Sequence, residues 1–125
     1  MAAEPSAGLS FGRKMRLKQP REFSLIRLEG RRLALGCLIA NWRLLPAGAP
    51  TRLGVITGKK IGNAVVRSRA RRLLRETFRR HQHELRQPLE LVLVARASIT
   101  GKNFSGVEQD YLATLRKAGL LKETK

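Results

Sequence analysis

The sequence has few acidic residues, few aromatic residues and no cluster of groups that would carry out hydrolysis. Its 125 residues contain nine Asp and Glu against 26 Lys and Arg, and the nine are scattered along the chain. A hydrolase requires an acid, a base, a nucleophile or metal ligands brought together. Neither a phosphate-binding glycine loop nor a catalytic triad signature occurs. The sequence therefore predicts a protein that is not catalytic by itself.

Cysteine and histidine offer no further chemistry. Cys37 is the single cysteine, so an intramolecular disulfide is excluded, and its apolar neighbours indicate a small buried side chain. His81 and His83 are two residues apart and point in different directions on a helix. Because no Cys or acidic cluster completes a zinc site, we expect both to be ordinary surface or helix-end residues.

Long apolar runs are missing as well. No segment approaches the length of a membrane-spanning helix, and the N-terminus has no apolar signal-peptide region, so we expect a soluble cytoplasmic protein. A hydrophobic content of 42% over 125 residues fits one packed domain. We expect residues 1–12 to form a disordered tail, residues 13–120 the domain, and residues 121–125 a frayed end.

What the sequence has in excess is positive charge, and residues 58–80 hold the densest part of it. This segment carries nine basic residues against Glu76 alone, which amounts to +8 of the formal net charge of +17. The nine are Lys59, Lys60, Arg67, Arg69, Arg71, Arg72, Arg75, Arg79 and Arg80. Such a balance favours nucleic acid as the partner, with an anionic membrane surface second.

The same segment has the period of an amphipathic helix. Asn63 suits the N-cap, because its side chain can accept a hydrogen bond from the first turn. An apolar arc then faces the core and the arginines fall on the opposite side, with Arg67 at the edge. The arc consists of Val66, Ala70, Leu73, Leu74, Thr77 and Phe78. Arginines at i, i+4 repel by roughly 0.2–0.5 kcal/mol per pair, so the row indicates a polyanionic partner more than a merely solvated face.

The run KKIGNAVVRSRARRLLRE, from Lys59 to Glu76, resembles the signature of the bacterial ribonuclease P protein component. That family reads K-K-x-G-x-A-V-x-R-N-R-x-K-R-x-x-R-E, and Ser68 stands here in place of its usual Asn. A second match lies upstream, where RLK at residues 16–18 and EF at residues 22–23 resemble the R-L-K-x-x-x-D/E-F that opens the first helix of the family.

The pattern of apolar and turn residues predicts the order helix, strand, strand, helix, strand, helix. We expect helices at residues 20–29, from residue 64, and at 107–118, with strands at 33–45, 52–57 and 89–95. This order predicts an α+β fold, a single-domain two-layer sandwich with helices packed on a small sheet. The fold of the family has the same order, α-β-β(-β)-α-β-α, with one further short strand allowed near the first two. The resemblance also implies a left-handed strand-helix-strand crossover around the basic helix, against the general rule.

Alternation within the first strand predicts which side chains face the core. Apart from Gly36, the even positions from Ala34 to Leu44 suit the core face, and Asn41 and Arg43 suit the other face.

The resemblance implies that the protein is the accessory subunit of ribonuclease P. In that ribonucleoprotein the catalytic subunit is RNA, which removes the 5′ leader of precursor tRNA with bound Mg²⁺. The magnesium is held mainly by the RNA subunit and the substrate. The expected partners are therefore the catalytic RNA and precursor tRNA, with no membrane and no small-molecule substrate.

The expected contacts fall on two surfaces. The basic helix and the turn before it are assigned to the catalytic RNA through Lys59, Lys60, Arg67, Ser68, Arg69, Arg71, Arg72 and Arg75. The resemblance places the leader in a cleft between the first helix and the sheet, where the candidates are Phe23, Arg27, Asn41 and Arg43. Phe23 either stacks on a leader base or packs in the core. Arg27 stands where family members often carry a second aromatic residue.

Two other classes of protein share this composition. A ribosomal protein or an RNA chaperone would be equally basic, and the ordered motif argues against both. A cationic membrane-surface protein would expose a helix face of large apolar residues. Here Trp42 lies on a predicted strand, and the apolar face of the basic helix is needed for the core.

Overall fold

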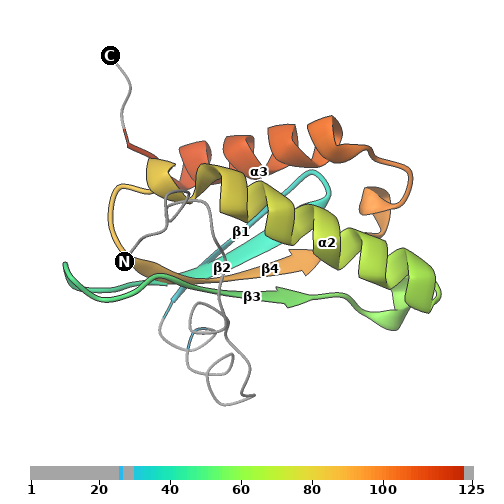
Figure 1. Cartoon of the computed structure of the whole chain (residues 1–125), viewed down its shortest axis with the longest axis horizontal. Coiled ribbons are helices and arrows are strands. Elements are labelled where there is room, and N and C mark those ends of the chain that lie inside the picture. Colours follow the sequence, from blue (N-terminus) through green and yellow to red (C-terminus); the bar gives the residue numbers. More distant parts are fainter. Residues whose placement is uncertain (1–25, 27–29, 123–125) are drawn as a thin grey trace, which may run out of the picture.

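The structure is a computed structural model that describes residue 26 and residues 30–122 (Figure 1). Its strands are β1 Arg31–Leu35, β2 Leu38–Leu44, β3 Arg52–Ile56 and β4 Leu89–Ala95, and its helices are α2 Ala64–His81 and α3 Phe104–Ala118. Short 3-10 turns lie at Lys59–Ile61, Gln82–Glu84 and Ala97–Ile99. Of the first expected helix only Ile26 is described, and it is helical and buried.

The four strands form one mixed sheet in the order β1-β2-β4-β3. β2 is antiparallel to both of its neighbours, whereas β3 and β4 are parallel. Both α2 and α3 cover the same face of this sheet and lie side by side (Figure 1). The predicted two-layer α+β fold is therefore confirmed, with β1 as the further short strand that the family allows.

The connection from β3 through α2 to β4 is left-handed. In Figure 1, α2 lies in front of the sheet, β3 and β4 both point to the right, and β4 lies above β3. Such crossovers are right-handed in almost all proteins, so this uncommon feature agrees with the family resemblance. The connection also brings the first turns of α2 next to the end of β3.

The single strand expected over residues 33–45 is wrong, because the chain reverses within it. Gly36 has a φ of 63°, and a Cβ at this position would lie 2.4 Å from the carboxylate of Asp110. Only glycine fits such a turn without strain. Asp110 Oδ2 also accepts a hydrogen bond from the backbone N–H of Cys37 at 2.9 Å. A residue of α3 thus fixes the turn between β1 and β2.

The reversal changes which side chains of β1 reach the core. Ala34 pairs with Ile39 and shares its sheet face, so it is exposed, whereas a continuous strand would have turned it inward. In β2 the predicted alternation holds, with Leu38, Ala40 and Trp42 buried. Leu44, expected in the core, is 49% exposed because it lies at the end of the strand.

The central strand β4 is buried on both faces. Leu89, Leu91 and Leu93 belong to the main core beneath α2 and α3, whereas Val92 packs with Ile26 on the opposite face. A strand covered on both sides reads as a continuous apolar run, which is why its limits were predicted correctly. Within the described part of the chain, no helix is long and apolar enough to cross a membrane.

Helix α3 begins three residues earlier than predicted. Asn103 caps it, since its Oδ1 accepts a hydrogen bond from the Gly106 N–H at 2.8 Å. The helix ends at Gly119, whose φ of 76° is left-handed. Tyr111 and Leu115 are fully buried, as expected for the core face of this helix.

Candidate nucleic-acid interface

The start of α2 presents two exposed lysines. Ile61 is buried and holds the preceding turn against the core, whereas Lys59 and Lys60 are exposed. Asn63 caps α2 as predicted, because its Oδ1 accepts a hydrogen bond from the Val66 N–H at 3.0 Å. The positive end of the helix dipole and two ammonium groups therefore lie together, an arrangement that attracts phosphate.

Arg71 is held in place by two hydroxyl groups. Its Nη1 donates to Thr57 Oγ1 at 2.7 Å and its Nη2 donates to Ser68 Oγ at 3.1 Å. Ser68, which replaces the usual Asn of the motif, therefore orients a neighbouring arginine. Sequence reasoning missed Thr57, although its position just before the lysine pair was a usable signal. Because a guanidinium has five N–H donors, Arg71 keeps most of them for a ligand.

Arg69 is engaged by a backbone oxygen outside α2. Its Nη2 donates to the backbone oxygen of Lys102 at 2.6 Å, which ties α2 to the loop before α3. Farther along α2, the guanidinium of Arg80 lies 4.8 Å from the ring centroid of Phe104, a cation–π contact with α3. The predicted basic face is thus divided, and Arg69 belongs to the flank that contacts α3 and its preceding loop.

Arg67, Arg72 and Arg75 lie on the remaining part of the basic face. Arg72 is exposed, and the other two are half-buried. The Nε–H of Arg67 is shielded and has no hydrogen-bond partner among the described residues. An unpaired buried donor of this kind costs about 1–3 kcal/mol. We call Lys59, Lys60, Arg67, Arg71, Arg72 and Arg75 the outer basic face.

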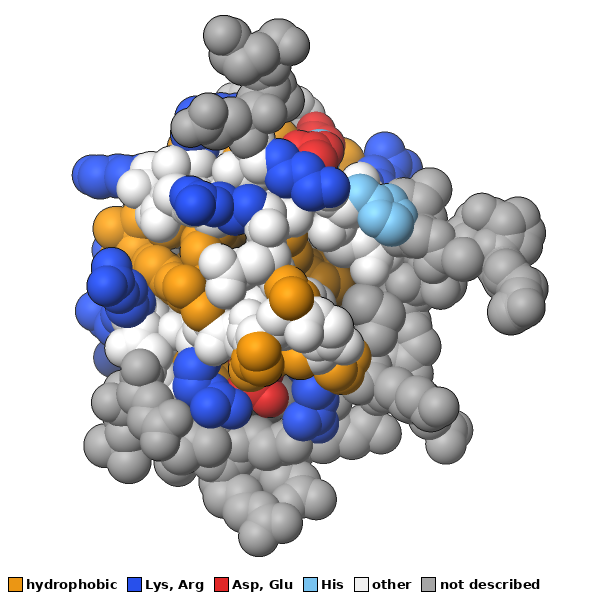
Figure 2. Space-filling view, turned by 90° about the vertical axis from the view of Figure 1, so that its left-hand side faces the viewer, with side chains coloured by type: hydrophobic (Ala, Val, Ile, Leu, Met, Phe, Trp, Pro, Cys, Tyr) orange, Lys and Arg blue, Asp and Glu red, His pale blue; other side chains and the backbone are white. Residues whose placement is uncertain are grey.

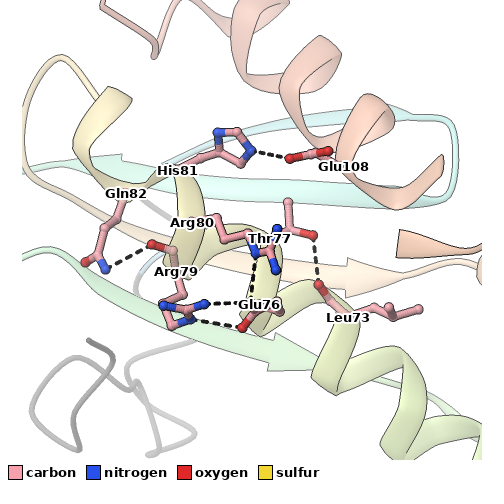
Figure 3. A network of polar contacts seen from close by, with 8 residues as sticks. All are labelled: Leu73, Glu76, Thr77, Arg79, Arg80, His81, Gln82 and Glu108. Atoms are coloured by element: carbon pink, nitrogen blue, oxygen red, sulfur yellow. Dashed lines mark hydrogen bonds and ion pairs between the residues drawn. The ribbon is translucent and has the colours of Figure 1, made fainter. Parts of the chain in front are cut away.

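The charge of the last turns of α2 is partly offset internally (Figure 3). Glu76 accepts hydrogen bonds from Arg79 at 2.9 and 2.6 Å and from Arg80 at 2.8 Å. These bonds, those from Arg79 first, lower the pKa of Glu76 from 4.5 to about 2. The acidic residue of the motif therefore offsets the arginines that follow it, and excess positive charge is concentrated in the first three turns.

His81 is not the ordinary helix-end residue that the sequence suggested. Its Nδ1 lies 2.6 Å from Glu84 Oε2 and its Nε2 lies 2.6 Å from Glu108 Oε2, the latter on α3 (Figure 3). Two carboxylate contacts require both ring nitrogens to donate, which is the protonated form. Burial by itself would lower the pKa of His81, but the hydrogen bonds to Glu108 and Glu84 outweigh it and raise that pKa above 6.5.

The second predicted surface involves the sheet face opposite α2 and α3. Arg43 of β2 lies directly across from Glu90 of β4, and its Nη2 and Nε are 2.8 and 3.2 Å from Glu90 Oε1. Arg52 of β3 lies 3.7 Å from the other carboxylate oxygen. Asn41 is half-buried one step along the same face. Arg43 is thus held by a buried acid that sequence reasoning missed.

Two of the predicted leader contacts, Phe23 and Arg27, lie outside the described residues. Between them, Ile26 packs against Val92 on the face that also carries Asn41 and Arg43.

Every carboxylate in the described part of the chain has a partner. Glu76 binds arginines of α2, Glu84 and Glu108 bind His81, Glu90 binds Arg43, and Asp110 lies 3.5 Å from the ammonium of Lys102. Among those residues, no group of three His, Cys, Asp or Glu could hold a metal ion. Burial first, then Asp110, raises the pKa of Cys37 to about 12, so its thiol is a poor nucleophile.

Known proteins match the chain over most of its length. A family model described as Ribonuclease P matches residues 11–119. The ribonuclease P protein component of Syntrophomonas wolfei is 40% identical over 108 residues, which cover 86% of this chain and 90% of that protein. The solved ribonuclease P protein of Thermotoga maritima is 28% identical, with a TM-score of 0.72 over 82% of this chain and 96% of that one. That of Staphylococcus aureus, at 23% identity, has a TM-score of 0.78 over 86% of this chain and 98% of that one, a likeness of fold.

Proposed function

This chain belongs to the bacterial ribonuclease P protein family, and we propose that its outer basic face binds the catalytic RNA of that tRNA-processing ribonucleoprotein. The observation that carries this proposal is the lack of acidic partners at the start of α2. No carboxylate of a described residue forms an ion pair with Arg67, Arg71 or Arg72. RNA phosphates supply the missing negative charge, and release of their counterions drives binding.

The orientation of Arg71 supports the same assignment. Thr57 and Ser68 hold its guanidinium before any partner arrives. A side chain that is already ordered loses less conformational entropy on binding, and its planar fork suits a phosphate. Lys59, Lys60 and Arg72 then act as exposed charges around an ordered centre.

We assign the 5′ leader of precursor tRNA to the opposite sheet face, through Asn41 and Arg43. The amide of Asn41 offers both donors and acceptors to a base. Arg43 is fixed by Glu90, which offsets part of its charge, so we assign its role to its position more than to its net charge. Phe23 and Arg27 stay predictions for the same surface.

Leader removal itself is assigned to the RNA subunit, with Mg²⁺ held mainly by RNA phosphates and the substrate. Bound there, Mg²⁺ would supply Lewis-acid chemistry for the hydrolysis. The described carboxylates do not fit a magnesium site, because each is engaged by a basic side chain. The protein contributes by neutralising crowded phosphates where two RNAs meet.

Reconstitution with purified components tests this division of labour. Protein mixed with precursor tRNA and Mg²⁺ is expected to leave the substrate intact, and addition of the catalytic RNA is expected to produce the mature 5′ end. Catalytic RNA without protein serves as the reference for how much the protein lowers the Mg²⁺ requirement. Cleavage by RNA-free protein would show that the reaction has been assigned to the wrong subunit.

Two double variants separate the proposed surfaces. Arg67→Ala with Arg72→Ala should weaken assembly with the catalytic RNA whether or not substrate is present. Asn41→Ala with Arg43→Gln should leave assembly intact and weaken binding of precursor tRNA more than that of mature tRNA. Glutamine at position 43 keeps an N–H donor for Glu90, which protects the fold. Equal loss of precursor and mature tRNA in a well-folded variant would contradict the leader assignment.

A further inference from the structure

One end of the molecule carries basic side chains around an apolar centre. Figure 2, which looks at the end that lies on the left in Figure 1, shows Lys and Arg side chains around a central group of hydrophobic ones. A cavity of about 170 Å³ here is lined by Arg31, Trp42, Leu44, Arg86, Gln87 and Gly119 among others. A second cavity, of about 260 Å³, shares the first three of these and adds Arg43. Because the two cavities share these lining residues they adjoin, and together we call them the end groove.

Among the described residues that line the end groove none is acidic, although Arg43 pairs with Glu90 just outside the lining, and two of the lining side chains are held by backbone oxygens. Arg86 Nη1 donates to the backbone oxygen of Gly119 at 3.0 Å, and Gln87 Nε2 donates to that of Leu45 at 3.2 Å. Arg31 is exposed at the start of β1. Leu44, 49% exposed, is one of two large hydrophobic side chains on the surface of the described part.

The chemistry of the groove fits a nucleotide better than a bare anion. Its wall includes the carboxyl end of α3, where the helix dipole is negative. The carbonyl groups of Gly119 and Leu120 there each accept one hydrogen bond from Arg86 and keep a second lone pair for a donor. A base can donate to these carbonyls and lay its face on Leu44, while its phosphate meets Arg31. An inorganic anion would bind Arg31 but could not donate hydrogen bonds to the carbonyl groups, which would repel it.

The position of the groove identifies the polymer. The groove reaches Arg43, and therefore continues the face to which the leader is assigned. In Figure 1 the first turns of α2, assigned to the catalytic RNA, lie on the right, and the end of α3 lies on the left. A leader that leaves the cleavage site beside the catalytic RNA would thus meet Asn41 and Arg43 before the groove.

We infer that the end groove binds a distal nucleotide of the single-stranded leader, farther from the cleavage site than those at Asn41 and Arg43. This inference rests on the leader assignment proposed above. It predicts that the protein senses leader length, because only a leader long enough to round the end of the sheet reaches Arg31 and Arg86.

The test measures binding of precursor tRNAs with short and long leaders to the assembled holoenzyme. The variant Arg31→Ala with Arg86→Gln removes two charges, and glutamine retains a donor for Gly119. We expect binding of the long-leader substrate to weaken roughly tenfold, the lower range for loss of a charge-assisted contact, with short-leader binding unchanged. Leu44→Ser should give a smaller loss, again only with the long leader, that persists at high salt.

The matched control is Arg116→Ala with Lys117→Ala, which removes the same charge from exposed positions that do not line either cavity. It should affect neither substrate. An unchanged long-leader affinity in the groove variant, or an equal loss in the control, would overturn the inference. Thermal unfolding of each variant excludes a folding defect. A separate measurement tests the leader assignment itself. If the variant Asn41→Ala with Arg43→Gln binds the short-leader substrate as tightly as the wild type does, that assignment fails.

Discussion

Removing three exposed charges from the outer basic face should flatten the salt dependence of RNA binding without harming the fold. Lys59, Lys60 and Arg72 are exposed, and none makes a side-chain hydrogen bond or ion pair within the described part of the chain. Their replacement by Ala therefore leaves no internal partner unsatisfied. Exposed substitutions of this kind change the free energy of unfolding by no more than about 0.5 kcal/mol.

The size of the effect follows from the number of phosphates neutralised. Each contact contributes roughly 0.7–0.9 to the slope of log affinity against log salt. If each of the three residues meets one phosphate, the slope of the triple variant should be smaller by about 2–3. Between about 50 and 200 mM salt, the affinity advantage of the wild type should then shrink roughly 20- to 40-fold.

Fluorescence anisotropy with labelled catalytic RNA, repeated across a salt series, measures this slope. The control replaces Arg116, Lys117 and Lys122, three exposed basic residues near the end of α3, and should leave the slope at the wild-type value. An unchanged slope in the first variant would refute the assignment of the outer basic face. Equal flattening in the control would show that the protein binds RNA through net charge alone.

Two further variants test the ion pairs at the end of α2. Glu76→Gln removes the negative charge that pairs with Arg79 and Arg80, so RNA affinity should rise at low salt and the salt slope should steepen. Unaltered RNA binding would show that Glu76 does not reduce the charge available to RNA. Because folding lowers the pKa of Glu76 from 4.5 to about 2, the ionised carboxylate stabilises the folded protein above pH 4.5. This contribution to the free energy of unfolding is lost as the pH falls through about 2. His81→Gln should be less stable than the wild type below pH 6.5. That gap should close as the pH rises through the raised pKa of His81, which denaturant titration at several pH values measures.

The elements predicted correctly are those whose pattern is local. The N-cap of α2 at Asn63 and the apolar run of β4 can both be recognised from neighbouring residues alone. The hairpin of β1 and β2 does not. Gly36 reads as a weak interruption of a strand, and its left-handed turn is explained by Asp110, which lies on another element. The predicted fold class is still correct, because β1 only adds one strand to the edge of the same sheet.

For the candidate site, periodicity separated the buried face of α2 from its polar face, but it did not show what each arginine on the polar face contacts. Arg69 and Arg72 are both on the polar side of α2 by sequence, yet Arg69 reaches a backbone oxygen of Lys102 and Arg72 remains exposed. That difference depends on a contact 33 residues away. Arg43 is a similar case, since its partner Glu90 belongs to a strand 47 residues later.

The described acidic residues offset basic side chains that lie away from the first turns of α2. The described carboxylates lie near the end of α2, on the sheet face opposite α2 and α3, and on α3 itself. Their partners are Arg79, Arg80, Arg43, His81 and Lys102. None forms an ion pair with the first turns of α2, so the charge at Lys59, Lys60 and Arg72 is not offset there. A uniformly basic surface would bind RNA in many orientations with similar free energy. Under the proposed assignment, local neutralisation elsewhere favours the orientation in which the first turns of α2 contact the catalytic RNA and the sheet face of Asn41 and Arg43 lies away from it.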